Sequence, residues 1–284
     1  MSQKLTITDH SRDIAGLKYV YPVISRRAGG LSIGINFNTN NACNWRCVYC
    51  QVPDLVRGSA PELDFKLLEE ELRFFLNEVL NGDFFDQFNV AENLRIIKDI
   101  AISGNGEPTS VKGFDKAVTL IADIATEFAV LPESHFVLIT NGGLIHQPSV
   151  QAGLRVLNNY KGQVWFKLDS ATEQGRLAIN DNKLSNEKTL KNLETCSALC
   201  ETYIQTCMLD YDECVDAEEQ RGAFFELLKQ IKHAKFKLKR IMLYTIARAS
   251  LQPEAEKLKR PAEEVMLEFA KRLEQLGYEV SVSI

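Results

Sequence analysis

Two adjacent stretches, LSIGINFN at 31–38 and NACNWRCVYC at 41–50, organise the chain. The first alternates apolar with small or polar residues, which is typical of a β-strand with one buried face. The second carries three thiols, Cys43, Cys47 and Cys50, in the spacing CxxxCxxC. The sequence therefore predicts a core strand that leads directly into a three-cysteine loop.

The three thiols have no fourth ligand nearby. No His, Asp or Glu lies within 41–50, and the first carboxylate after it is Asp54. A closed structural zinc site takes four protein ligands, whereas a [4Fe–4S] cluster is held by Cys thiolates. Three thiolates would leave one iron open to a further ligand. The spacing favours such a reactive cluster, and a zinc knuckle completed by a distant ligand is the alternative.

The order of strand, loop and helix recurs along the chain. Five further strands are predicted at 96–103, 136–140, 164–168, 203–209 and 238–245, with a terminal strand candidate at 278–284. Helices are predicted at 63–80, 114–128, 149–157, 188–199, 217–232 and 261–276, and a polar substrate-side loop at 171–186. This alternation predicts an α/β fold with parallel strands.

We expect a partial (β/α)6 TIM-like barrel, with residues 1–30 as a short N-terminal extension and 31–284 as the barrel domain. The active site of such a barrel lies at the C-terminal ends of the strands. The chain places its unusual residues there: the thiols, GNGEP from Gly104, NGG from Asn141, the pair Asp169 and Ser170, and the acidic group Asp210, Asp212 and Glu213.

Composition narrows the class of protein. The 284 residues are 45% hydrophobic and 25% charged, which is ordinary for a globular protein with a large core. The net charge of -5 argues against a general nucleic-acid binder. No apolar run of membrane-spanning length occurs, and the N-terminus lacks a hydrophobic signal segment. We therefore expect no membrane partner and a cytoplasmic location, where thiols remain reduced.

The motifs resemble those of a known family. CNWRCVYC, with the aromatic Tyr49 before its last cysteine, is similar to the signature of the radical S-adenosylmethionine (SAM) enzymes. GNGEP resembles the Gly-Gly-Glu element that follows the second strand in that family. Together with SRRAGGLSIGINF, TNGG and LYTIAR, these stretches resemble the wyosine-synthase-like branch of iron–sulfur oxidoreductases.

The resemblance implies that Cys43, Cys47 and Cys50 are the catalytic and metal-binding residues of a [4Fe–4S] cluster, with SAM on its open iron. One electron would convert SAM to methionine and a 5′-deoxyadenosyl radical, which abstracts hydrogen from a substrate. A flavodoxin- or ferredoxin-type reductant is implied. The expected substrate is an RNA nucleoside or a related base. A peptide- or protein-modifying enzyme and a non-catalytic iron–sulfur binding protein are the alternatives.

The resemblance also implies a set of SAM-binding residues. Gly104 and Gly106 would let the backbone approach SAM, and Glu107 would accept a hydrogen bond from its amino group. The other candidates are Tyr49 for the adenine, Thr140 and Asn141 for the pocket wall, and Asp169 or Ser170 for the ribose hydroxyls. Lys167 could point to the same face as Asp169, and Arg248 could pair with the SAM carboxylate or a substrate anion. A plain turn, a helix N-cap or a structural ion pair is the alternative role for these residues.

Four further cysteines, Cys196, Cys200, Cys207 and Cys214, raise the hypothesis of an auxiliary iron–sulfur cluster. Against it, the first two fall on a predicted helix and Cys207 falls inside a predicted strand. Buried cysteine often behaves as a small hydrophobic residue. Both interpretations remain open at this point.

Overall fold

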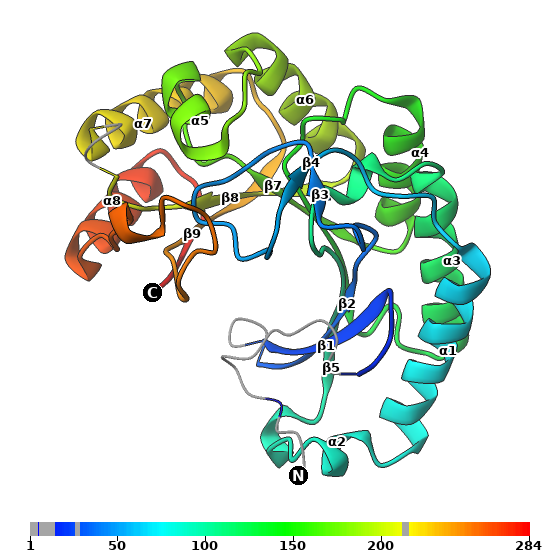
Figure 1. Cartoon of the computed structure of the whole chain (residues 1–284). Helices are drawn as coiled ribbons and strands as arrows, with labels where there is room; N and C mark the ends of the chain where they lie inside the picture. Colours follow the sequence, from blue (N-terminus) through cyan, green and yellow to red (C-terminus); the bar gives the residue numbers. More distant parts are fainter. Residues whose placement is uncertain (1–4, 6–14, 26–28, 212–215) are drawn as a thin grey trace.

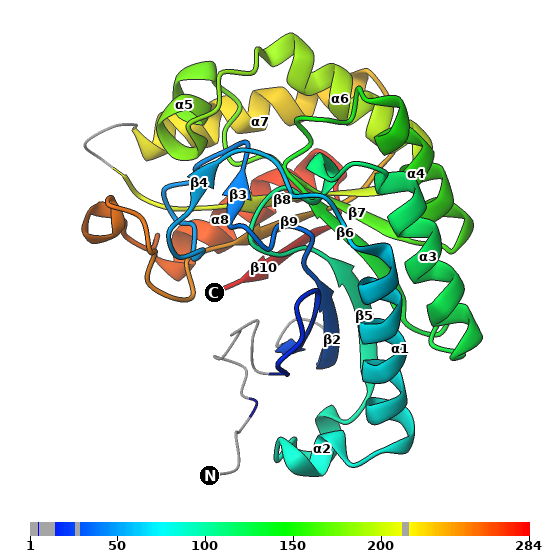
Figure 2. The same cartoon turned by 45° about the vertical axis from the view of Figure 1, so that its right-hand side comes forward.

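The computed structural model describes residues 5, 15–25, 29–211 and 216–284 (Figures 1 and 2). Eight strands form one sheet in the order β1-β2-β5-β6-β7-β8-β9-β10. These are β1 (Val20–Ser25), β2 (Gly30–Ile35), β5 (Ile97–Ile102), β6 (His135–Thr140), β7 (Gln163–Lys167), β8 (Glu201–Cys207), β9 (Leu238–Tyr244) and β10 (Val280–Ser283). β1 is antiparallel to β2, and every other neighbouring pair is parallel.

Six long helices cover the convex face of the curved sheet (Figure 1). They are α1 (Phe65–Asn81), α3 (Phe114–Glu127), α4 (Pro148–Asn159), α6 (Asn186–Leu199), α7 (Ala217–His233) and α8 (Glu263–Gln275). The shorter elements are α2 (Phe84–Gln87), α5 (Glu173–Asn180), the small strands β3 (Ala42–Cys43) and β4 (Val56–Arg57), and the 3-10 turns η1 (Glu92–Leu94), η2 (Pro108–Ser110) and η3 (Ala255–Lys257).

The partial (β/α)6 TIM-like barrel predicted from the sequence is confirmed. Six units of strand and helix follow one another from β2 to α8, and β10 adds a seventh parallel strand at the edge. The sheet is open, since β1 and β10 are its two ends. Residues 20–25, which the sequence assigned to an N-terminal extension, pair along the whole of β2.

The prediction of a loop at 171–186 is wrong, because α5 occupies residues 173–180. Thr172 caps this helix by accepting a hydrogen bond from the Gly175 amide. The helix buries Arg176, Ile179 and Asn180, and two of these three side chains are polar. A polar buried face gives no apolar stripe at helical spacing, so sequence periodicity did not reveal the helix.

The two faces of the sheet differ in composition, and β5 shows the difference most clearly. Ile100 and Ile102 are completely buried in the core beneath the helices. Asp99, Ala101 and Ser103, which alternate with them, line a cavity on the concave face. Successive side chains of a strand point to opposite faces, so alternation along each strand produces an apolar helix side and a polar interior.

No helix in the part of the chain that the structure describes is both long enough and apolar enough to cross a membrane.

Candidate active site

A cavity of about 540 Å³ lies on the concave face of the sheet. Ten of the site residues predicted from the sequence line it: Cys43, Cys47, Tyr49, Cys50, Gly104, Gly106, Glu107, Asn141, Lys167 and Arg248. Loops at the C-terminal ends of the strands supply most of these, and we call this part the thiol end. The other part, called the strand end, is lined by Tyr21, Val23, Ser25, Ser32, Gly34 and Asp99 of β1, β2 and β5.

The thiol loop, residues 41–52, is held on one side by the C-terminal end of α5. The Arg46 amide donates to the Asn180 carbonyl at 3.0 Å, and the Val48 amide donates to the Ile179 carbonyl at 2.8 Å. These bonds join segments more than 130 residues apart in the sequence. The helix that the sequence did not predict therefore fixes the backbone of the cysteine motif.

The segment after β9 supports the thiol loop from another side. The Leu251 amide donates to the Cys50 carbonyl at 2.9 Å, and the Ser250 hydroxyl donates to the Val48 carbonyl at 2.6 Å. The loop thus receives backbone-directed hydrogen bonds from two distant segments, which restricts its conformation before any ligand binds.

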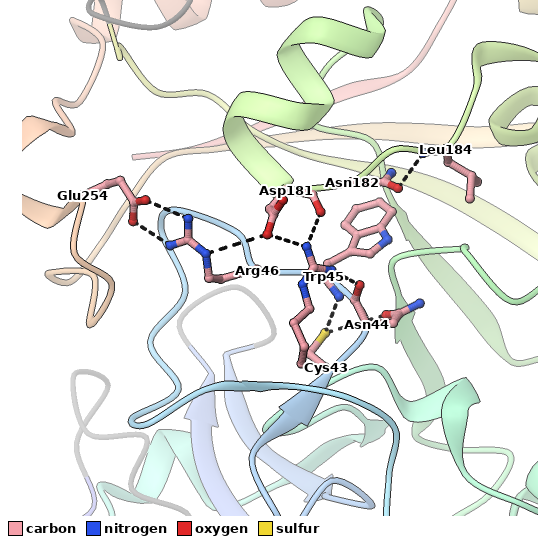
Figure 3. A network of polar contacts seen from close by, with 9 residues as sticks. Cys43, Asn44, Trp45, Arg46, Asp181, Asn182, Leu184 and Glu254 are labelled. Atoms are coloured by element: carbon pink, nitrogen blue, oxygen red, sulfur yellow. Dashed lines mark hydrogen bonds and ion pairs between the residues drawn. The ribbon is translucent and has the colours of Figure 1, made fainter.

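Ion pairs fasten the outer rim of the thiol loop (Figure 3). Arg46 makes a two-pronged contact with Glu254, with nitrogen–oxygen distances of 2.9 and 2.8 Å. Arg57 pairs with Asp181, which ends α5 in a left-handed conformation with φ of 48°. Arg46 also lies 3.9 Å from Asp181. Figure 3 shows these charges beside Cys43, Asn44 and Trp45.

The thiols themselves receive hydrogen bonds from neighbouring N–H groups. The Trp45 amide donates to Cys43 Sγ at 3.4 Å, and Asn180 Nδ2 donates to Cys47 Sγ at 3.3 Å. Burial raises the pKa of the Cys43 thiol to about 12 and that of the Cys47 thiol to about 11. Thiolates form here when a bound cation compensates the charge, as metal ligation does.

The donor set fits a cluster better than a single ion. Across residues 5, 15–25, 29–211 and 216–284, no three His, Cys, Asp or Glu side chains converge as a mononuclear metal requires. In a [4Fe–4S] cluster each thiolate binds a different iron, so the three sulfurs surround a volume rather than a point. Cys43, Cys47 and Cys50 all line the wall of one cavity.

Glu107 is completely enclosed beside the thiol loop, with 2% of its surface exposed. Its carboxylate accepts four hydrogen bonds: from the Thr109 amide at 3.1 Å, the Thr109 hydroxyl at 2.6 Å, the Thr140 hydroxyl at 2.6 Å and the Asn141 amide at 2.6 Å. Burial raises the pKa of this carboxyl, and the four donors oppose that rise. Thr140 and Asn141 therefore position Glu107 in the cavity wall.

The glycines of the GNGEP loop allow this loop to pack closely against the thiol loop and against the residues that follow β2. A Cβ on Gly106 would lie 2.0 Å from the Ala42 carbonyl oxygen, and one on Gly104 would lie 2.2 Å from Asn36 Oδ1. Gly104 also has φ of 145°, a conformation that favours glycine. Close contact between two loops of the protein is thus a requirement that the sequence did not reveal.

Asp169 and Ser170 do not line the cavity. The Asp169 carboxylate accepts hydrogen bonds from the Tyr49 hydroxyl, from Asn180 Nδ2 at 2.7 Å and from the Cys207 amide at 2.8 Å. Ser170 donates to Gln220 Oε1 at 2.6 Å. In this conformation Asp169 supports Tyr49 and the thiol loop, and the ribose contact expected of this pair stays a prediction.

Lys167 projects from β7 into the cavity. Its Nζ donates to the Tyr244 hydroxyl at 2.9 Å and lies 5.0 Å from the centre of the Tyr49 ring. Burial by itself lowers the pKa of Lys167, but Tyr244, Asp169 and Cys47 outweigh it and raise the pKa well above the ordinary value. Lys167 is therefore a fixed positive charge at the thiol end.

The second set of cysteines does not form a cluster site. Cys196 and Cys200 lie before β8 begins, whereas Cys207 is its last residue. Seven strand residues separate the two positions by roughly 20 Å at 3.3 Å per residue. All three thiols are buried, and Cys214 lies outside the described residues. These cysteines cannot share one auxiliary cluster, so that hypothesis is wrong for the three that are described.

Of the acidic group after β8, the structure describes only Asp210, and this residue lies outside the cavity lining. Asp210 exchanges two backbone hydrogen bonds with Lys259 at 3.0 Å and lies 3.9 Å from Arg221. It is not among the residues that line the cavity. Asp212 and Glu213 lie outside the described residues.

Sequence reasoning missed three residues that belong to this site. Asn180 bonds to both Cys47 and Asp169, and it lay in the stretch expected to be a loop. Trp165 and Asp99 line the cavity from β7 and β5. A signal for Asp99 was present: it is a charged residue within a buried parallel strand, on the same face as Ala101 and Ser103.

Comparison with known proteins agrees with this geometry. The profile of the radical SAM superfamily matches residues 37–216, which include the thiol loop, Glu107 and Asp169. The chain belongs to the radical SAM superfamily. The cofactors of this family are a [4Fe–4S] cluster and SAM, and the cavity wall carries the three thiols that fit the cluster.

Individual relatives are distant. A UPF0026 protein of Methanocaldococcus jannaschii is 30% identical over 166 residues, which are 56% of this chain and 42% of that protein. The chain spans between 17% and 42% of the length of the curated relatives that it matches.

Two of the solved structures that share the fold illustrate the likeness. One is TYW1 with a lysine–pyruvate adduct bound, with a TM-score of 0.55, 18% identity and coverage of 86% of this chain and 73% of that one. The other is a radical SAM methyltransferase from Sphaerobacter thermophilus, with a TM-score of 0.58, 11% identity and coverage of 93% and 68%. At these identities the likeness concerns the fold alone.

Proposed function

We propose that this chain is a radical SAM enzyme that abstracts a hydrogen atom from a substrate held in the cavity. The observation that carries the proposal is the position of the three thiols and Glu107 around one cavity. When bound, the cluster and SAM supply the chemistry: one electron cleaves SAM to methionine and a 5′-deoxyadenosyl radical, which takes hydrogen from the substrate. The protein supplies the position of the reacting groups and the exclusion of water.

Each predicted SAM contact has a stated physical basis. Lys167 and Arg248 line the cavity and carry positive charge, which suits the SAM carboxylate. Glu107 Oε2, which accepts one hydrogen bond while Oε1 accepts three, has room for the SAM amino group, and Asn141 Oδ1 is a second acceptor in the cavity wall. Tyr49 borders the same space and offers an aromatic face for the adenine. These assignments are proposals that a SAM-bound structure would test.

We propose an RNA nucleoside or a related base as the substrate, in keeping with the motif resemblance. A cavity of about 540 Å³ lies within the range for one drug-sized ligand, roughly 300–1,000 Å³. After SAM is bound, the remaining space suits a single base or side chain rather than a folded macromolecule. Trp165 and Tyr21 line this space, and aromatic faces stack well on bases. Modification of a peptide side chain is the competing possibility.

The activity is tested by anaerobic incubation of cluster-loaded protein with SAM and dithionite. Release of 5′-deoxyadenosine and methionine is expected without added substrate. Cys43→Ala should abolish it, whereas Cys200→Ala, a buried cysteine far from the cavity, should retain it with about four irons per chain. A fully loaded sample that leaves SAM intact would instead indicate a non-catalytic iron–sulfur protein.

The natural electron source proposed here is a flavodoxin- or ferredoxin-type reductant, in the cytosol. It should replace dithionite in the same assay. Radical SAM enzymes take the electron that cleaves SAM from an external reductant.

A further inference from the structure

The strand end of the cavity extends well beyond the residues assigned to the cofactors. Asp99 lies on β5 four positions before Ser103, the residue that follows the strand, so it is roughly 13 Å from the start of the GNGEP loop. Tyr21, Ser32 and Gly34 border the same region from β1 and β2. The antiparallel strand β1 therefore helps to enclose this compartment of the cavity, which is continuous with the thiol end.

This compartment contains a carboxylate with few partners. Four acidic residues of the described chain are buried: Glu71, Asp99, Glu107 and Asp169. Glu71 accepts hydrogen bonds from two backbone amides, Glu107 accepts four bonds and Asp169 accepts three. Asp99 accepts one, from the Ser32 hydroxyl. Among the four it is the carboxylate whose hydrogen-bonding capacity is least used.

Leaving a buried carboxylate so poorly satisfied is costly. Asp99 is 7% exposed, and within the described residues it makes no ion pair. Burial raises the pKa of Asp99 to about 6, while the Ser32 hydroxyl and the nearby His135 lower it. An ionised carboxylate has room for about four hydrogen bonds. The free positions face a cavity, so a ligand with N–H donors can use them.

The cavity that Asp99 lines also has aromatic walls, which favour a flat ligand. The Tyr21 ring lies across Gly34, where an added Cβ would be 2.1 Å from the ring carbon Cζ. The Tyr21 hydroxyl is fixed by Ser103 Oγ at 2.8 Å. Trp165 lines the cavity from β7. Two aromatic side chains therefore border a space that also contains a hydrogen-bond acceptor.

We propose that the strand end is the substrate subsite and that Asp99 binds the exocyclic amino group of a nucleobase placed between Tyr21 and Trp165. Carboxylates read amino groups of bases by accepting their hydrogen bonds, as in contacts of Asp or Glu with cytosine. A base that carries a keto oxygen at this position places an acceptor against the carboxylate and is rejected. This inference rests on the proposed function, because it assumes a nucleoside substrate in the same cavity.

The test is equilibrium binding of nucleoside pairs to the cluster- and SAM-loaded protein, measured by calorimetry. Cytidine with uridine, and adenosine with inosine, each differ by an amino group in place of a keto oxygen. The amino member should bind roughly tenfold to a hundredfold more tightly, the usual range for one base contact. Asp99→Asn should lose this preference, whereas Asp123→Asn, an exposed matched substitution on α3, should keep it.

Each outcome decides the inference. Equal binding within both pairs, an unchanged preference in Asp99→Asn, or no nucleoside binding overturns it. Binding of agmatine that depends on Asp99, without nucleoside binding, also overturns it and assigns the subsite to a guanidinium side chain. Asp99→Ser answers the same question if the Asn variant does not fold. Release of 5′-deoxyadenosine by the wild type and by Asp123→Asn in the absence of substrate separates failure of this inference from failure of the proposed function.

Discussion

The two ends of the cavity differ in how their polar groups are satisfied. At the thiol end the side chains bond to one another: Glu107 accepts four hydrogen bonds, and Asn141 Nδ2 donates to Asn44 Oδ1 at 2.7 Å, which links two loops. At the strand end Asp99 accepts one. Side chains whose hydrogen bonds are made within the protein hold the thiol end in a fixed geometry, which suits a permanently bound cofactor. A buried group with few hydrogen bonds, such as Asp99, indicates where a ligand donates the remaining bonds.

The largest effect is expected where the two loops of the thiol end touch. Gly106→Ala places a Cβ 2.0 Å from the Ala42 carbonyl, so the GNGEP loop or the thiol loop must move. We expect loss of most bound iron and of SAM cleavage, measured by iron and sulfide analysis after anaerobic reconstitution.

The matched control for that glycine is Gly222→Ala in α7, where an added Cβ meets no atom within 4 Å. It should retain the cluster and stabilise the fold by about 0.5–1 kcal/mol, because alanine is the better helix former. Normal iron content in Gly106→Ala would show that the contact between the loops is not required.

A moderate effect is expected at Asn180. Its Nδ2 donates to Cys47 Sγ at 3.3 Å, and hydrogen bonds to cluster sulfurs help to set the reduction potential. Asn180→Ala should shift the midpoint potential to a more negative value, on the order of tens of millivolts. Potentiometric titration followed by electron paramagnetic resonance measures the shift. Asn192→Ala, which removes a buried amide bonded to the Gly142 carbonyl, should leave the potential unchanged.

At the strand end we expect a change in stability with pH. The pKa of Asp99 is raised to about 6 from an ordinary value of 3.8, so the folded state holds its proton more tightly than the unfolded state. Its contribution to stability is therefore lost as pH rises from about 4 to about 6. Asp99→Asn should remove this loss and stabilise the protein by about 3 kcal/mol at pH 7.5.

Urea unfolding of the wild type and Asp99→Asn at pH 4, 5, 6 and 7.5 measures this difference. The two proteins should converge at the lowest pH. His135 lowers the pKa of Asp99, so His135→Gln serves as the control for this neighbour. If Asp99→Asn is no more stable than the wild type at pH 7.5, the ionised Asp99 carboxylate does not destabilise the folded protein.

The smallest effect is expected on the rim of the thiol loop. Glu254→Gln breaks a two-pronged contact with Arg46, whose side chain is 33% exposed. Exposed pairs of this kind contribute less than about 1 kcal/mol. Iron content should stay normal, and the chemical denaturation midpoint should fall slightly. Loss of the cluster in this variant would show that the rim, and not only the hydrogen bonds beneath it, fixes the thiols.

The sequence alone determined the architecture and the centre of the site. Strands, turns and helices were predictable because hydrophobic periodicity is a local property, as in the stripe of Leu68, Leu72 and Phe75 on α1. The three thiols were recognisable because their chemistry depends on spacing within one loop. Periodicity failed at α5, whose buried face includes Arg176 and Asn180.

Only the tertiary structure decided what each side chain touches. Asn180 meets Cys47 and Glu254 meets Arg46 across 133 and 208 positions of sequence. Residue 106 must be glycine because the Ala42 carbonyl oxygen occupies the space of a Cβ. Asp169 accepts a hydrogen bond from the Tyr49 hydroxyl. Asp99 accepts one hydrogen bond, fewer than any other buried acid among the described residues, and only the folded structure shows this difference. Such pairings arise from the curvature of the sheet, which brings remote strand ends together and leaves no trace in local composition.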